Sequence, residues 1–217
     1  MFKLNLIMER KWAAAAVLLA ALAVGAPARA DGGKGAMQIG LSSHCLWPQA
    51  DADSLDPAFD YGVIFHYWLN STTSIMAGVE MLSLNAPLLV DGKDEGITFS
   101  TTALMAGVRY RPKIDLWLRP YAELGVGYQS WQTNPGLSEL KSRSGSSVLY
   151  FAGGGLSYDF RHALTAGVNV RYLYFPMNEN LESRALHKTG KKYNVTTDPF
   201  ENVGFVTAGV ELVWKFK

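Results

Sequence analysis

One pattern limits what this chain can fold into: apolar and polar residues alternate in eight separate segments of similar length. Clusters of Gly, Pro, Asn, Asp and Ser separate these segments. Successive side chains of a β-strand point to opposite faces, so each segment predicts a strand with one apolar face and one polar face. The predicted strands span residues 36–47, 58–70, 74–84, 98–111, 116–131, 147–160, 163–175 and 203–216.

The connections between these strands alternate strictly between long and short. The three short ones are "NSTT", "PKID" and "RHA", and the other four are long and polar. Outer-membrane barrels have short periplasmic turns and long extracellular loops, whereas a soluble sandwich has no reason to alternate its connections. The sequence therefore predicts an all-β fold, an eight-stranded antiparallel up-and-down transmembrane β-barrel with both ends of the mature chain in the periplasm. The extracellular loops are expected near Asp53, Lys93, Leu137 and Lys188.

The apolar parity carries aromatic residues at both strand ends and aliphatic residues, such as Val63, Leu124 and Val168, between them. Two aromatic belts that flank an aliphatic zone are typical of a surface in contact with lipid. The predicted periplasmic girdle consists of Tyr67, Tyr110, Tyr158, Phe160, Trp214 and Phe216. The predicted extracellular girdle consists of Trp47, Phe59, Tyr61, Tyr128, Tyr150, Tyr172 and Tyr174.

The opposite parity combines many glycines with charged residues. A glycine opposite a long charged side chain allows a narrow barrel to accommodate its own interior. An isolated buried charge is costly, so charges inside the barrel must be paired. We therefore predict a lumenal ion-pair network that blocks continuous water flow. Its members share the inward parity and the membrane-spanning part of their strands: Glu80, Arg109, Glu123, Arg171 and Glu211.

The start of the chain has the layout of a secretory signal. Arg10 and Lys11 precede an apolar run from Trp12 to Val24, and Ala28-Arg29-Ala30 provides a cleavage site with small residues. The apolar run is shorter than the roughly 20 residues that a membrane-spanning helix needs. We expect residues 1–30 to be a cleaved signal peptide and residues 31–217 to be the barrel domain, with translation beginning at Met1 or Met8.

Composition excludes several classes of protein. The formal net charge is +1, and the predicted leader contains four basic residues and one acidic residue, so the remainder is weakly acidic. It offers no basic surface for nucleic acid. Cys45 is the only cysteine, which rules out an intramolecular disulfide, and no cysteine stands directly after the apolar run to carry a lipoprotein anchor. No apolar stretch beyond residue 30 is long enough for a helical membrane span.

The signal peptide, the eight strands, the stretch "GVRYRPKIDLWLRPYAELGVGY" and the aromatic-ended last strand "TAGVELVWKFK" resemble a known superfamily. This is the small outer-membrane barrel superfamily that includes the transmembrane domain of outer-membrane protein A, outer-membrane protein X and outer-membrane protein W. The resemblance implies that the last strand pairs with the first and is read by the barrel assembly machinery. Lys217 follows Phe216 here, which departs from the usual terminal Phe. No second domain is expected after the barrel, so peptidoglycan attachment is not implied.

Three functions are compatible with such a barrel. The first is a structural or surface-interaction role, with a filled lumen and four extracellular loops. The second is a narrow pore or a conduit for small hydrophobic molecules, as the resemblance to outer-membrane protein W implies. The third is modification of lipid A, which requires an outward His and Ser pair near the rim. His162 in "DFRHALT" has no serine two residues on, so we do not expect an enzyme.

The sequence gives weaker indications of ligands. His44 and His66 share the inward parity, but no Cys or further His lies beside them, so we expect hydrogen bonding and neither a metal nor another cofactor. The expected surroundings are outer-membrane lipid and lipopolysaccharide, and a monomer is favoured. The longest loop contains a cationic run that is either simply solvated or in contact with lipopolysaccharide phosphates or an acidic partner. This run consists of Arg184, Lys188, Lys191 and Lys192.

Overall fold

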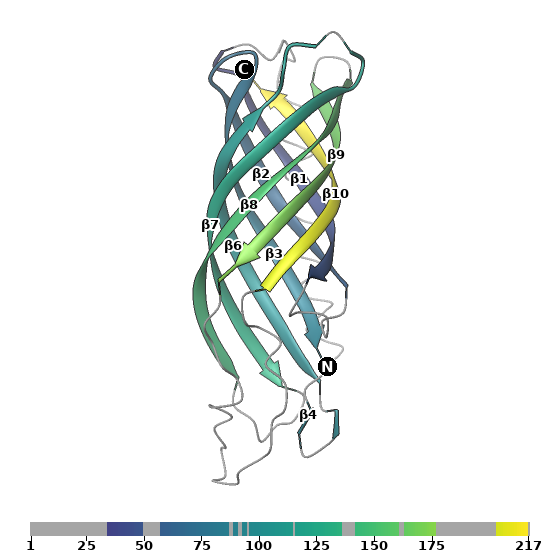
Figure 1. Cartoon of the computed structure of the whole chain (residues 1–217). Helices are drawn as coiled ribbons and strands as arrows, with labels where there is room; N and C mark the ends of the chain where they lie inside the picture. Colours follow the sequence, from purple (N-terminus) through teal and green to yellow (C-terminus); the bar gives the residue numbers. More distant parts are fainter. Residues whose placement is uncertain are drawn as a thin grey trace.

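The computed structural model describes nine stretches of the chain. These are residues 34–49, 57–86, 89–90, 93–94, 96–114, 116–135, 142–160, 163–176 and 203–216. Eight of the strands form one closed barrel, in the spatial order β1-β10-β9-β8-β7-β6-β3-β2 (Figure 1). The barrel strands are β1 (Met37–Gln49), β2 (Ala58–Trp68), β3 (Thr73–Ala86), β6 (Ile97–Tyr110), β7 (Arg119–Pro135), β8 (Arg143–Phe160), β9 (Leu164–Phe175) and β10 (Val203–Phe216). The prediction of an eight-stranded antiparallel barrel is confirmed.

Closure depends on the pairing of the last strand with the first. β10 runs antiparallel to β1 from Met37 opposite Phe216 to Gln49 opposite Gly204. This pairing satisfies the backbone groups that would otherwise form two open sheet edges, which lipid cannot hydrogen-bond. In the described part of the chain, no helix is long and apolar enough to cross a membrane.

Two predicted strand ends were wrong, and both flank the connection between β7 and β8. The strands predicted over 116–131 and 147–160 are β7, which continues to Pro135, and β8, which already begins at Arg143. Their added residues pair with one another, for example Gln132 with Ser144. The outward side chains there are polar, so the hydrophobic alternation ends although the backbone ladder continues. The predicted loop around Lys93 also contains a short hairpin of β4 (Leu89–Val90) and β5 (Lys93–Asp94).

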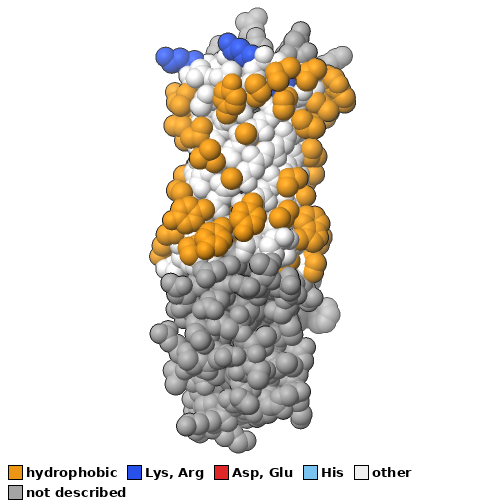
Figure 2. Space-filling view, viewed as in Figure 1, with side chains coloured by type: hydrophobic (Ala, Val, Ile, Leu, Met, Phe, Trp, Pro, Cys, Tyr) orange, Lys and Arg blue, Asp and Glu red, His pale blue; other side chains and the backbone are white. Residues whose placement is uncertain are grey.

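The outer surface of the barrel is apolar. Leu124 is 65% exposed and Phe59 is 69% exposed, so these side chains project away from the lumen instead of packing into it. Figure 2 shows hydrophobic side chains gathered toward both ends of the described surface. Every residue of the predicted girdle lies on this outward parity, and none of them is buried. An apolar outer face of this kind is typical of barrels that span a membrane.

The interior is divided along the barrel axis. β1 begins at one end of the barrel, which we call the turn end. It finishes at the opposite end, which we call the loop end and which is the lower end in Figure 1. Inward residues near the loop end form an apolar layer in which Phe99 stacks on Trp131, with ring centroids 5.9 Å apart. Beyond this layer, the lumen contains the charged residues together with further buried apolar side chains, such as Ile64, Met76 and Phe151. Each member of the apolar layer is at most 4% exposed: Leu46, Leu84, Phe99, Trp131, Phe175 and Phe205.

Candidate functional site

The middle of the lumen contains the charged residues that were predicted to face inward from their alternate positions along the strands. Three of them stand directly opposite a glycine on the neighbouring strand. These pairs are Gly62 with Glu80, Gly153 with Arg171 and Gly167 with Glu211. A Cβ added at Gly153 would clash with the backbone oxygen of Val170 and lie 2.8 Å from Cγ of Arg171, so a larger residue there would displace both the strand and the arginine. The glycines therefore provide the space in which the long side chains cross the lumen.

Arg109, on β6, binds two carboxylates at once. Its Nη1 and Nη2 donate to the two oxygens of Glu211, at 2.6 and 2.8 Å. Its Nε and Nη2 also donate to Oε2 of Glu123, at 3.0 and 2.7 Å. The guanidinium lies over the ring of Tyr121, 3.9 Å from its centroid. Charge-assisted, two-point contacts of this type hold the arginine in one orientation.

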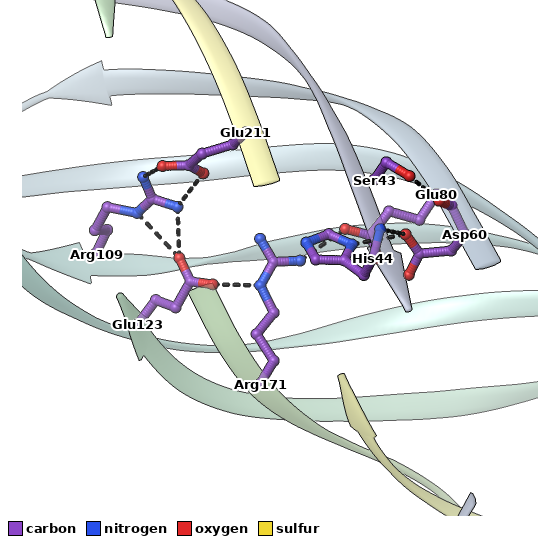
Figure 3. A network of polar contacts seen from close by, with 8 residues as sticks. All are labelled: Ser43, His44, Asp60, Glu80, Arg109, Glu123, Arg171 and Glu211. Atoms are coloured by element: carbon purple, nitrogen blue, oxygen red, sulfur yellow. Dashed lines mark hydrogen bonds and ion pairs between the residues drawn. The ribbon is translucent and has the colours of Figure 1, made fainter. Parts of the chain in front are cut away.

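Arg171, on β9, extends the same network toward β3. Its Nε donates to Oε1 of Glu123, and its Nη1 donates to Oε1 of Glu80 at 2.7 Å. Glu123 therefore joins the two arginines, with one oxygen for each (Figure 3). The structure thus brings together all five residues that the sequence placed in a lumenal network. Each of these five side chains is at most 8% exposed.

A second pair adjoins this network on the neighbouring strands. His44 on β1 and Asp60 on β2 are direct cross-strand partners, and Nδ1 of His44 lies 2.6 Å from Oδ1 of Asp60. The same carboxylate oxygen accepts the backbone N–H of His44 at 3.0 Å. Figure 3 shows His44 and Asp60 beside Glu80 at one end of the network. The sequence predicted that His44 faces the lumen, and the register between β1 and β2 identifies Asp60 as its partner.

Another charged cluster closes the turn end. Asp159 binds Nζ of Lys215 at 2.7 Å and Nη1 of Arg119 at 3.0 Å, and Nη1 of Arg111 lies 3.8 Å away. Thr165 donates its hydroxyl to the same carboxylate at 2.6 Å. This cluster was not predicted, because its members come from separate parts of the sequence: β7 with Arg119 pairs with β8, which carries Asp159, and Lys215 lies on β10.

Comparison with known proteins identifies the family of this chain. The family model described as "Outer membrane protein beta-barrel domain" matches residues 16–216. The chain belongs to this outer-membrane barrel family. The membership supports a location in the bacterial outer membrane, whereas cleavage of residues 1–30 stays a prediction because they lie outside the described residues.

Solved structures share the fold of this outer-membrane barrel. Neisserial surface protein A is 15% identical, with a TM-score of 0.58, over 84% of this chain and 100% of that chain. A major outer membrane protein of Thermus thermophilus is 12% identical, with a TM-score of 0.50, over 83% of this chain and 99% of that chain. A search of curated proteins found no match. At these identities the comparison establishes the architecture and transfers no ligand.

Some predicted residues of this outer-membrane barrel lie outside the described part. They are His162 and the cationic run of the longest loop, which comprises Arg184, Lys188, Lys191 and Lys192. The predicted loop centres Asp53 and Leu137 lie outside it as well. The described candidate site is therefore the lumen.

Proposed function

We propose that this outer-membrane barrel is a sealed anchor that presents its surface loops to partners at the cell exterior. The observation that carries the proposal is the network around Glu123, which joins side chains from β3, β6, β7, β9 and β10 across the lumen. A barrel of eight strands has an interior just wide enough for side chains to fill. Arg109 and Arg171, which are both ion-paired with Glu123, leave little room in that space for a continuous column of water.

Two further layers support a sealed lumen. The apolar layer lies on the loop side of the network, and the rings of Phe175 and Phe205 are 5.3 Å apart within it. The Asp159 cluster lies on the turn side, where Lys215 is 6% exposed. Ions that crossed the barrel would have to pass an apolar layer and two ion-paired layers in succession. We propose no catalytic role for such a lumen.

A conduit for small hydrophobic molecules is the second candidate. The apolar layer favours it, because Phe99 and Trp131 would offer an apolar ligand a surface near the loop end. These two rings are buried against each other, however, so the ligand would have to displace them. The sealed anchor requires no such rearrangement, and we prefer it for that reason.

The display of the loops can be tested on intact cells. Single cysteines placed near Asp53, Lys93, Leu137 and Lys188 in a Cys45→Ala variant are expected to react with an impermeant thiol reagent. The matched control is a cysteine at Ser71, in the exposed turn between β2 and β3. It should react only after the outer membrane is opened. If Ser71→Cys is labelled on intact cells and the loop cysteines are protected, the barrel has the opposite orientation to the one predicted.

The longest loop supplies a second test, because its cationic run is expected to attract lipopolysaccharide phosphates. Replacement of Lys188, Lys191 and Lys192 by Gln should weaken lipopolysaccharide binding several-fold at low salt, and added salt should reduce the difference. The control variant Lys113→Gln changes an exposed lysine at the turn end and should bind as the wild type does. Unchanged binding of the triple variant at low salt would show that this run is merely solvated.

A further inference from the structure

We propose that His44, Asp60 and Glu80 form a binding site for a divalent transition-metal ion inside the barrel. The three residues come from β1, β2 and β3, which are consecutive neighbours in the barrel wall. Each offers one ligand atom, and these atoms all lie within 4.8 Å of one another. All three side chains are buried, which distinguishes the group from the exposed acidic clusters that are common on protein surfaces.

The charges in the described middle of the lumen provide an independent reason. Four carboxylates, those of Asp60, Glu80, Glu123 and Glu211, face two guanidinium groups. This buried region, where uncompensated charge is costly, therefore has two more carboxylates than guanidinium groups, while the surplus cations around Asp159 lie at the turn end. A bound divalent cation would neutralise the two extra carboxylates. The excess lies on the Asp60 side, because Arg109 and Arg171 both bind Glu123, whereas Asp60 has no arginine among its ion pairs.

The histidine nitrogen that faces Asp60 is Nδ1, so Nδ1 is the atom that would bind the ion. It lies 2.6 Å from Oδ1 of Asp60, and the ion would replace the proton that now joins the two groups. Nε2 lies on the opposite side of the buried ring and is not a ligand of this site. Glu80 binds Arg171 through Oε1, so its second oxygen can serve another cation. The site can therefore form without breaking the network around Glu123.

The donor set selects the class of ion. One imidazole and two carboxylates suit Zn²⁺ and similar transition metals, whereas Ca²⁺ takes six to eight oxygen ligands and Mg²⁺ keeps several waters. The ion is acquired while the barrel folds, because the closed site lies between the apolar layer and the Arg109 pairs. Spacing along the sequence gives no sign of this site, since its ligands come from three separate strands.

The decisive experiment folds the barrel with Zn²⁺ in detergent, removes free metal by gel filtration and measures the zinc that stays with the folded protein. The wild type should retain about one zinc per barrel. Asp60→Asn and His44→Gln should retain almost none. Asp159→Asn is the matched control, because it makes the same change in a lumenal carboxylate at the turn end, and it should retain zinc. Folded wild type without zinc, or equal retention by Asp60→Asn, would overturn the proposal.

A measurement on the wild type alone covers the case in which the variants do not fold. X-ray absorption of the zinc-loaded barrel should show one imidazole nitrogen and oxygen ligands at about 2.0–2.2 Å. Sulfur in the coordination shell, or an absence of imidazole, would place the ion elsewhere and overturn the proposal. Folding with Mg²⁺ in place of Zn²⁺ should leave no metal bound after gel filtration, and retained Mg²⁺ would contradict the proposed class of ion.

Discussion

Replacement of Glu123 by alanine is expected to lower the free energy of unfolding by about 3–5 kcal/mol, the range for removing one partner of a buried ion pair. Glu123 is 3% exposed and accepts hydrogen bonds from both Arg109 and Arg171. The variant would leave two guanidinium groups buried without the carboxylate that joins them. Urea unfolding in lipid vesicles, followed by tryptophan fluorescence, measures the loss.

Glu123→Gln is the matched control for this variant. It keeps the length of the side chain and one oxygen that can accept from an arginine, so its loss should be clearly smaller than that of the alanine variant. If Glu123→Ala unfolds at the same urea concentration as the wild type, the network contributes nothing to stability.

Replacement of Arg171 by alanine is expected to open the lumen. Arg171 is 1% exposed, and it faces Gly153, which has no side chain to fill the space that the arginine leaves. The change also unpairs Glu80 and leaves Glu123 with Arg109 alone. Water attracted by these carboxylates should enter, so the variant should show discrete current steps in planar bilayers. Glu80→Ala should have the same effect in weaker form.

Arg119→Ala serves as the control for both channel variants. Arg119 also pairs with a carboxylate, but its side chain is 44% exposed at the turn end, where water already reaches it. Its removal should therefore leave the conductance at the level of the bare membrane. Current steps in Arg119→Ala that equal those of Arg171→Ala would show that the middle of the lumen is not the barrier.

The inward and outward faces could be predicted from the sequence because a strand has a strict period of two. Arg171 and Tyr172 illustrate this, since adjacent residues of β9 lie on opposite faces, one 1% and the other 48% exposed. Charge then identified the network, because an inward Arg in a narrow barrel requires an inward Glu. The partners of each arginine could not be predicted, since the alignment of neighbouring strands is set by the closed barrel and not by any one segment.

The apolar layer could not be predicted for a different reason. Near the loop end both parities of β9 are apolar, with Tyr172 and Tyr174 outward and Leu173 and Phe175 inward. A pattern of alternation gives no information where both faces carry the same kind of residue. The extensions of β7 and β8 were missed because their outward residues are polar. Residues such as Gln132 are as polar as the loop that follows, so the alternation that indicates a strand is absent there.

The measurement that tests the sealed lumen most directly is the conductance of the purified wild-type barrel in a planar bilayer at high salt. We expect a current no greater than that of the bare membrane, with folding verified in the same sample. Steady single-channel steps from the folded wild type, reproducible between insertions, would contradict the sealed lumen and favour a conducting pore.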